Sequence, residues 1–372
     1  MLQLFGNGIA FRALRWIGIE SLTFFIAKDR GIMLPRLFSL KPQATALILL
    51  LCSVASSLPE RAIGDQSEMF EISTRHLPDH FRSIDFQNPN VEINKWQGNG
   101  WLCSTVEDAL PATPTNALTI LYVHGNFMER NNALERVRII DGYFRQQTDQ
   151  PYRLLMLSWP SQRGSKPLRD VFDNAESAEC QSLYVSWILR RLQHETQVSV
   201  LGFSFGARAV TGGLHLNAGG SLPGFCPIPT MDEGILPHYR LGLVAPAIDR
   251  GWISPNERHG LALTHVDSLI NLYNSKDPVL RRFRFLDRIG RPIAAGFAGF
   301  TGLNGLESLS NPLATSPLSG QSRVRQYDCG SVIGNTHSER SYYGECHYFR
   351  MMIQHLLWKE TGESNFNACV VP

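Results

Sequence analysis

The chain has 372 residues, 43% of them hydrophobic, which is enough to bury the core of a domain of about 250 to 300 residues with further segments attached. Its 35 basic and 33 acidic side chains give a formal net charge of +2, and six of the basic but only two of the acidic ones lie in the first 55 residues. The rest of the chain has no basic excess, so its charge gives no case for nucleic-acid binding.

The N-terminal 55 residues have the order of an export signal. A basic stretch begins at Met33, an apolar run covers residues 44–55, and the run ends in a small-x-small pattern that predicts cleavage before Ser56. The apolar run is too short to span a bilayer comfortably. We therefore expect an exported protein (periplasmic, at the cell surface or extracellular) with no stable membrane span in its mature form, translated from Met1 or from Met33.

The cysteines favour disulfides over a metal site. Loss of Cys52 with the signal leaves six, an even number that permits disulfides in an exported protein, with all 15 connectivities open. No two of them have Cys-x-x-Cys spacing and no histidine cluster accompanies them, so we expect neither a metal nor a cofactor. We expect Cys180, on the apolar face of a predicted helix, to be a buried free thiol. The six are Cys103, Cys180, Cys226, Cys329, Cys346 and Cys369.

Residues 56–115 are polar and interrupted by prolines, and they contain two segments that favour strands, Phe70–Thr74 and Val91–Trp96. We predict an N-terminal extension that adds antiparallel edge strands to the domain that follows it. That domain is expected to span residues 116–360, and residues 361–372 to form a C-terminal tail.

The regular part of the chain begins at Ala117–Val123, a near-continuous apolar run typical of a strand that is buried on both faces. A predicted helix follows, with apolar residues from Ala133 to Phe144 at helical spacing. Strands that alternate with helices in this way predict an α/β fold, a mostly parallel, doubly wound sheet with helices on both faces. Further strands are expected at Arg153–Ser158, from Val198, and at Arg240–Ala245, Ser268–Tyr273 and Arg323–Tyr327.

The strand that starts at Val198 leads into Gly202-Phe203-Ser204-Phe205-Gly206, a Gly-x-Ser-x-Gly pattern followed by a helix that opens with small residues. A serine at a sharp strand-to-helix turn is held in a strained conformation that exposes its hydroxyl, and the glycines remove side chains that would collide there. The start of the helix supplies N–H groups and a positive dipole end that favour a developing oxyanion. The pattern predicts Ser204 as a nucleophile.

A serine hydroxyl is a weak nucleophile until an imidazole accepts its proton. Chemistry in parallel sheets gathers at the carboxyl ends of the strands, and His337 lies in a glycine-containing loop just after the last predicted strand. We predict His337 as the general base, with His347 as the alternative. We predict Asp277, which follows the penultimate strand, as the acid that orients the imidazole, with Asp249 as the alternative.

These motifs resemble those of the α/β-hydrolase superfamily, and the resemblance runs from about Ala117 to Trp358. The serine turn, the His124-Gly125 turn and the order of aspartate before histidine are superfamily-level signals. The turn Trp159-Pro160-Ser161 and the sequence Ala-Pro-Ala-Ile-Asp at 245–249 are similar to those of bacterial α/β-hydrolases of unknown function.

The resemblance implies an α/β-hydrolase fold, a catalytic triad of Ser204, His337 and Asp277, and an oxyanion hole made by the backbone N–H groups of Asn126 and Phe205. The serine turn departs from the commoner family form, because Phe203 stands where histidine is frequent and Phe205 where methionine is frequent. Neither change removes a catalytic group, but both alter the wall around the nucleophile.

The expected function is that of an exported serine hydrolase, esterase- or lipase-like, that cleaves a small-molecule or lipid-like acyl ester. The alternatives are an acyltransferase of the same fold and a non-catalytic binding protein at the cell surface. We interpret the basic run Arg281–Arg284 as a solvated helix face. The glycine-rich stretch within residues 290–320 either roofs an acyl pocket or packs against residues 56–115.

Overall fold

A computed structural model of the chain describes residues 67–78, 80–162, 164–165, 167–229, 238–285, 292–303 and 323–359. The chain divides into two units, Met1–Gly64 and Asp65–Pro372, and every described residue lies in the second. The predicted signal with its cleavage site and the predicted C-terminal tail lie outside the described residues. Most of the glycine-rich stretch 290–320 does too.

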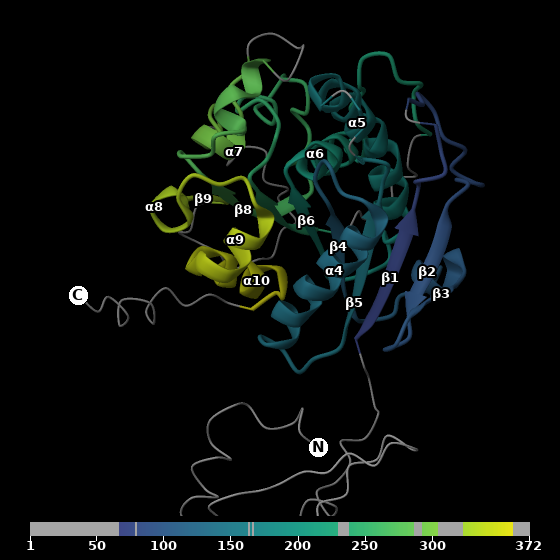
Figure 1. Cartoon of the computed structure of the whole chain (residues 1–372). Coiled ribbons are helices and arrows are strands. Elements are labelled where there is room, and N and C mark those ends of the chain that lie inside the picture. The colour runs from purple at the N-terminus through teal and green to yellow at the C-terminus, as the bar shows by residue number, and fades with distance from the viewer. Residues whose placement is uncertain are drawn as a thin grey trace, which may run out of the picture. The chain divides into compact units, whose positions relative to one another are not determined.

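A nine-stranded sheet in the order β3-β2-β1-β5-β4-β6-β7-β8-β9 organises the described chain (Figure 1). Every neighbouring pair from β1 to β9 is parallel, and only β2 and β3 are antiparallel to their neighbours. The mostly parallel sheet predicted from the sequence is therefore confirmed. The strands are β1 (Glu68–Ser73), β2 (Glu92–Trp96), β3 (Trp101–Cys103), β4 (Leu118–Val123), β5 (Tyr152–Ser158), β6 (Val198–Phe203), β7 (Tyr239–Val244), β8 (Val266–Tyr273) and β9 (Val324–Asp328).

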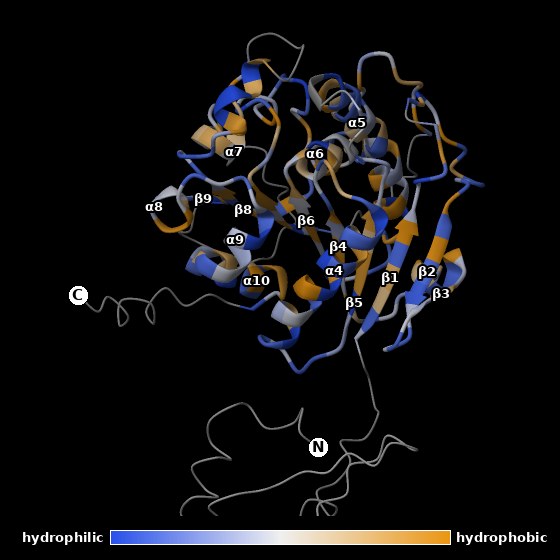
Figure 2. Cartoon of the chain, in the orientation of Figure 1, coloured by the Kyte–Doolittle hydropathy of each residue, from blue (hydrophilic) through white to orange (hydrophobic). Residues whose placement is uncertain are grey.

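The central strands form the core of the molecule. All residues of β5 and β6 are buried, and so are all residues of β4 except the first. Figure 2 shows hydrophobic residues along these strands. Burial on both faces explains why their sequences are near-continuous apolar runs rather than alternating ones.

Helices cover both faces of the sheet (Figure 1): α4 contacts α10, and the long helix α5 packs along α6. On α4 the predicted face from Ala133 to Phe144 is buried. No helix among the described residues is both long and apolar enough to cross a membrane. The helices are α3 (Val106–Ala109), α4 (Arg130–Arg145), α5 (Pro167–Arg191), α6 (Phe205–Asn217), the 3-10 helix η1 (Leu280–Phe285), α7 (Ala295–Ala298), α8 (Gly330–Ile333), α9 (Glu339–Glu345) and α10 (His347–Leu356).

The segment before β4 differs from the prediction at one strand. β2 and β3 do lie antiparallel at the edge, but β1 lies inside the sheet and pairs in parallel with β5. The strand contains two glutamates, Glu68 and Glu71, and charged residues are uncommon inside a sheet. Here Glu71 is buried, and its carboxylate is paired with Arg130 of α4, which offsets the cost of burying the charge.

Candidate active site

The predicted serine turn lies between β6 and α6. Ser204 has φ 51° and ψ −117°, a conformation that a non-glycine residue adopts only under strain. A Cβ at Gly206 would lie 2.1 Å from the backbone oxygen of Val123, and one at Gly202 would lie 2.8 Å from the Cα of Ala207. Both positions therefore require glycine, because strand and helix approach each other too closely for any side chain.

Three predicted residues from three different loops form a chain of hydrogen bonds. Ser204 Oγ lies 3.0 Å from His337 Nε2, and His337 Nδ1 lies 2.6 Å from Asp277 Oδ2. Because a carboxylate only accepts, Nδ1 carries the proton and Nε2 keeps a lone pair toward the serine hydroxyl. Asp277 is fully buried, whereas 20% of the His337 side chain is exposed. This arrangement can activate a serine.

The second oxygen of Asp277 is held by the backbone. Asp277 Oδ1 accepts hydrogen bonds from the N–H groups of Val279 and Leu280, both at 2.9 Å, so the residue also caps the turn that begins η1. The alternative acid, Asp249, accepts from Gly251 N at 2.8 Å and from Ile293 N at 2.9 Å, one bond to each oxygen. The geometry thus places Asp277, and not Asp249, against the imidazole.

The alternative base, His347, lies away from the serine, and so does His355, the other histidine after His337 among the described residues. His347 is the first residue of α10, and its ring contacts that of Tyr348 at a centroid distance of 3.9 Å. His355 is buried near the end of the same helix, and burial lowers its pKa to about 3. The imidazole of His337 instead contacts the ring of Phe203, the residue that precedes the serine, at 5.5 Å.

The predicted oxyanion turn follows β4. Asn126 Oδ1 accepts hydrogen bonds from Phe127 N at 2.8 Å and from Asn174 Nδ2 at 2.7 Å, so this side chain fixes its own turn. Phe205 is the first residue of α6, where backbone N–H groups lack intrahelical acceptors. Neither the Asn126 nor the Phe205 N–H has an acceptor among the described residues.

His124 supports this turn through hydrogen bonds of its ring. Trp159 N donates to His124 Nε2 at 3.2 Å, and Nδ1 lies 2.9 Å from the carbonyl oxygen of Gly125, which places the ring proton on Nδ1. Burial, followed by the charge of Arg75, lowers the pKa of His124 to about 3. The ring of Trp159 stacks on the imidazole at 5.4 Å. His124 is therefore a neutral support.

Two supporting residues were missed by the sequence analysis. Arg75, just after β1, donates to Ser158 Oγ at 2.7 Å and to the Met128 carbonyl oxygen at 2.9 Å, tying β1 to the oxyanion turn. Asn274 is buried directly after β8, and its Nδ2 donates to the carbonyl oxygens of Gly334 and Thr336, both at 2.9 Å. Asn274 and Arg75 each directly follow a predicted strand, but the strand before Arg75 was predicted to be an antiparallel edge strand, so only Asn274 had a usable signal.

A third missed residue is Glu339, which is buried two positions after His337. It accepts a hydrogen bond from Tyr122 of β4 at 2.8 Å and another from Tyr343, and Arg136 Nη1 lies 3.2 Å from its second oxygen. Burial raises the pKa of Glu339, and the charge of Arg136 opposes that shift. The cluster fixes the start of α9 to the sheet and to α4.

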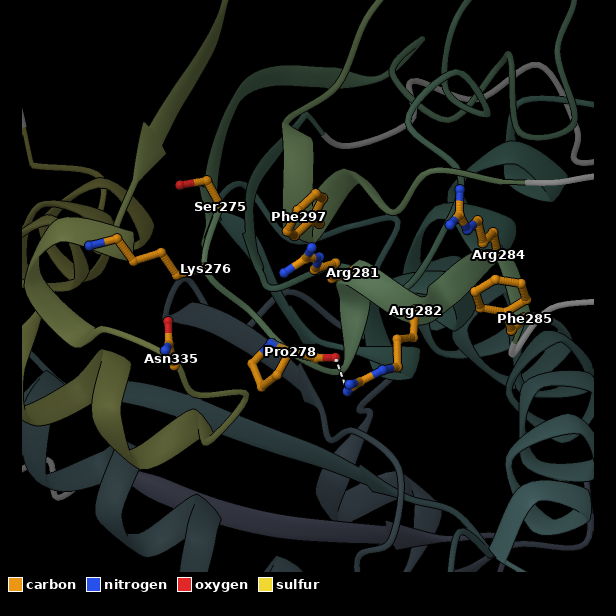
Figure 3. Close-up of a pocket in the computed structure, with 9 residues that line it drawn as sticks. All are labelled: Ser275, Lys276, Pro278, Arg281, Arg282, Arg284, Phe285, Phe297 and Asn335. Atoms are coloured by element: carbon orange, nitrogen blue, oxygen red, sulfur yellow. Dashed lines mark hydrogen bonds between the residues drawn. The ribbon is translucent and has the colours of Figure 1, made fainter.

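A pocket of about 570 Å³ adjoins these loops (Figure 3). Lys276 and Asn335 approach from one side and the exposed arginines of η1 from the other. Arg282 Nη1 donates to the Pro278 carbonyl oxygen at 3.1 Å. Four lining side chains are cationic and none is acidic, so the run that we interpreted as a solvated face lines a basic pocket. The lining residues are Ser275, Lys276, Pro278, Arg281, Arg282, Arg284, Phe285, Phe297 and Asn335.

Comparisons with known proteins find only solved structures. No family model matches the chain, and no curated protein matches it. An esterase, Est2 with bound propionate, from the planctomycete Thermogutta terrifontis is 11% identical, with a TM-score of 0.33, over 76% of this chain and 92% of that one. MGS-M1, an α/β-hydrolase from a Medee basin deep-sea metagenome library, is 8% identical, with a TM-score of 0.29, over 73% and 96%.

No cluster of three or more metal-ligating side chains occurs in the part of the chain that the structure describes. The candidate site brings together side chains from the turns after β6, β8 and β9 and the backbone of the turn after β4. The mostly parallel sheet, with Ser204 at the turn between its central strand β6 and α6, is an α/β-hydrolase-like fold, as the sequence led us to expect.

Proposed function

We propose that the protein is a serine hydrolase that cleaves carboxylic esters through an acyl-enzyme. The observation that carries this proposal is the hydrogen-bonded chain from Ser204 Oγ through His337 to the buried carboxylate of Asp277. A strained turn holds the serine, and a separate loop supplies each partner. Nucleophile, base and orienting acid are thus in contact before any substrate binds.

In the proposed reaction, Ser204 Oγ attacks the ester carbonyl carbon while His337 Nε2 takes the hydroxyl proton. The imidazolium that forms is stabilised by Asp277, which stays ionised. The backbone N–H groups of Asn126 and Phe205 donate to the tetrahedral oxyanion. The C–O bond to the alcohol then breaks, and His337 gives the alcohol its proton. Water repeats the sequence on the acyl-enzyme, which releases the acid and restores Ser204.

The proposed substrate is a small-molecule or lipid-like acyl ester. Phe203 and Phe205 flank the nucleophile, and Phe203 lies against the imidazole, so the wall beside the serine is apolar. We propose that the protein is exported and cleaved before Ser56. Mass spectrometry of the N-terminus of the exported protein tests this: an intact N-terminus upstream of Lys41 would contradict it.

The function itself is tested with a fluorophosphonate probe and with p-nitrophenyl butyrate. We expect the probe to label the wild type but not Ser204→Ala, and His337→Ala to lose both labelling and nearly all turnover. Ser199→Ala is the matched control: this buried serine lies on β6, the strand that leads into the turn, and donates to the Leu356 carbonyl oxygen, so the variant should label normally. A folded wild type that neither labels nor turns over esters would overturn the proposal and favour a binding protein.

Transfer of the acyl group to an alcohol, in place of water, would be seen in the products of the reaction. The acyl-enzyme is common to both reactions, so labelling does not separate them. A wild type that labels but releases acid only slowly, and that forms a new ester when glycerol is added, would make the protein an acyltransferase.

A further inference from the structure

Two buried cysteines lie at the two ends of the segment that carries His337. Cys329 follows β9 and Cys346 immediately precedes α10, 17 positions later. Their Sγ atoms are only 2.7 Å apart. The other described cysteines have no such neighbour: Cys103 and Cys226 are exposed, and the sulfur of Cys180 contacts Arg82 at 3.7 Å.

We propose that Cys329 and Cys346 form a disulfide bond that closes the histidine segment, residues 330–345, at its base. Cys329 N donates to the Tyr273 carbonyl oxygen at 2.8 Å, which fixes the first cysteine to the end of β8. The Cys346 carbonyl oxygen accepts from Phe349 N at 2.9 Å, which fixes the second to the first turn of α10. The two backbones are thus held while the sulfurs face each other. This inference does not rest on the proposed hydrolase activity.

The surroundings give the two thiols different roles. Contact with Cys329 lowers the pKa of Cys346, and Cys346 is also the N-cap residue of α10, a position at which the start of a helix favours a thiolate. The same contact, followed by burial, raises the pKa of Cys329. Since the thiolate is the nucleophile in thiol–disulfide exchange, Cys346 attacks the external disulfide first. Cys329 then attacks Cys346 in the mixed disulfide, which completes the bond between the two cysteines.

The oxidant is another disulfide, either of a thiol–disulfide oxidoreductase or of a small molecule such as oxidised glutathione. The Cys346 thiolate attacks one sulfur of it, which forms a mixed disulfide and releases one thiolate. Cys329 then loses its proton and attacks Cys346 Sγ, which releases the second thiolate. Two protein thiols are oxidised and one external disulfide is reduced, so the electrons balance. Both sulfurs are buried, so the exchange takes place while the chain folds.

The bond would restrict the segment from which His337 projects. At its tip the segment is already held by Asn274, which donates to Gly334 and Thr336, and at the start of α9 by the buried Glu339. A bond between the two ends removes unfolded and partly open conformations of the segment. Amide hydrogen exchange in residues 330–345 should therefore be slower in the oxidised protein than in the reduced one.

Peptide mapping of the full chain tests the bond directly. The protein is refolded in a buffer of reduced and oxidised glutathione, denatured, treated with N-ethylmaleimide and digested without reduction. We expect a joined pair of peptides that contain Cys329 and Cys346, two hydrogens lighter than the sum of the two thiol peptides. Cys180 should carry the maleimide. Alkylation of Cys329 and Cys346 in the refolded protein would overturn the proposal.

A second measurement uses variants. A reductant should lower the Tm of the wild type by about 5 to 10 °C, as expected for a closed loop of this length. Cys180→Ala, which removes a buried thiol elsewhere, should show the same shift, and Cys346→Ala should show none. A shift that persists in Cys346→Ala would contradict the bond. If that variant does not fold, the peptide map of the wild type decides alone.

Discussion

The serine turn and the histidine segment meet at one hydrogen bond, but they are held in different ways. The turn is fixed by close backbone contacts: Gly202 lies against Ala207 of the helix that follows, Gly206 lies against the end of β4, and Ser204 takes its strained conformation between β6 and α6. The histidine segment is fixed from outside by side chains distant in sequence, such as Asn274 and Tyr122. One half of the site is fixed by backbone packing, and the other by side chains from distant elements.

The difference matters because the backbone strain of Ser204 and the position of the His337 ring depend on different parts of the structure. A strained residue persists only where its surroundings over-determine it, and for Ser204 those surroundings are the packed ends of β6 and α6. His337 needs no unusual backbone, but its ring must lie within hydrogen-bond reach of two groups on other loops. Changes in the turn should therefore affect folding, and changes around the histidine segment should affect turnover first.

Among changes that leave Ser204 and His337 in place, the largest effect is expected at Asp277. Asp277→Asn keeps the shape of the side chain but removes the charge that stabilises the imidazolium, so kcat should fall by roughly 10⁴-fold. Asp249→Asn is the matched control, because its oxygens accept only backbone hydrogen bonds. Turnover of p-nitrophenyl butyrate by the two folded variants measures this. Near-wild-type turnover by Asp277→Asn, with loss in Asp249→Asn, would move the acid to the earlier strand.

Glycine-to-alanine changes in the serine turn and in the histidine segment should have opposite effects on the free energy of unfolding. A Cβ at Gly206 would meet the backbone oxygen of Val123 at 2.1 Å, so Gly206→Ala should lower the free energy of unfolding by about 3 kcal/mol or more. Gly344 lies in α9, and a Cβ there meets nothing within 4 Å. Gly344→Ala should raise stability by about 0.5 to 1 kcal/mol, because alanine favours the helix. Urea denaturation of both variants checks the contrast, and equal effects would refute it.

The same contrast between the serine turn and the histidine segment explains which residues could be predicted from the sequence. Ser204 was predicted as the nucleophile because glycine spacing and an apolar strand are local signals. His337 and Asp277 were predicted as its partners because both follow strands of a parallel sheet. Asn274, Arg75 and Glu339 were missed, since their partners lie on other elements and no local pattern shows the contact. The parallel pairing of β1 was missed because the ion pair that buries Glu71 is formed with a helix far along the chain.

Loss of an outside support should lower both activity and stability, whereas a matched change elsewhere on the sheet should lower stability alone. Asn274→Ala leaves the carbonyl oxygens of Gly334 and Thr336 without their donor, and a displaced imidazole should lower kcat/KM by about ten- to hundred-fold. The matched control is Asn271→Ala on the same strand, which removes the buried bond to Gln326 Oε1. Each change should cost about 1 to 3 kcal/mol of stability. Equal kcat/KM in the two variants would show that the histidine segment does not need Asn274.

Acid should destabilise the fold through imidazoles that take no part in the proposed reaction. Burial lowers the pKa of His124 and of His355 to about 3 and that of His259 to about 4, so all three are neutral in the folded protein. The unfolded chain protonates them near pH 6.5 and therefore binds more protons as the pH falls. Each should remove about 1.5 kcal/mol of unfolding free energy between pH 6.5 and pH 5. Urea denaturation at pH 6.5 and at pH 5 should show a smaller loss of unfolding free energy in His355→Gln than in the wild type. An equal loss would show that His355 does not contribute to the acid destabilisation.

The smallest effect is expected at the basic pocket, which lies beside the loops of Asp277 and His337 and not beside the serine turn. Its cationic side chains should favour an ester that carries a negative charge. The double variant Arg281→Gln, Arg282→Gln should therefore lower kcat/KM for p-nitrophenyl hemisuccinate by about two- to five-fold. The same variant should leave kcat/KM for p-nitrophenyl butyrate unchanged. Salt near 1 M should remove the difference, because these side chains are exposed to solvent. Arg145→Gln is the control: this exposed arginine lies at the end of α4, close to the start of β5 and therefore near the amino ends of the parallel strands, whereas the pocket lies at their carboxyl ends. If the Arg145 variant discriminates between the two esters as strongly as the double variant does, the preference comes from the overall charge of the protein and not from this pocket.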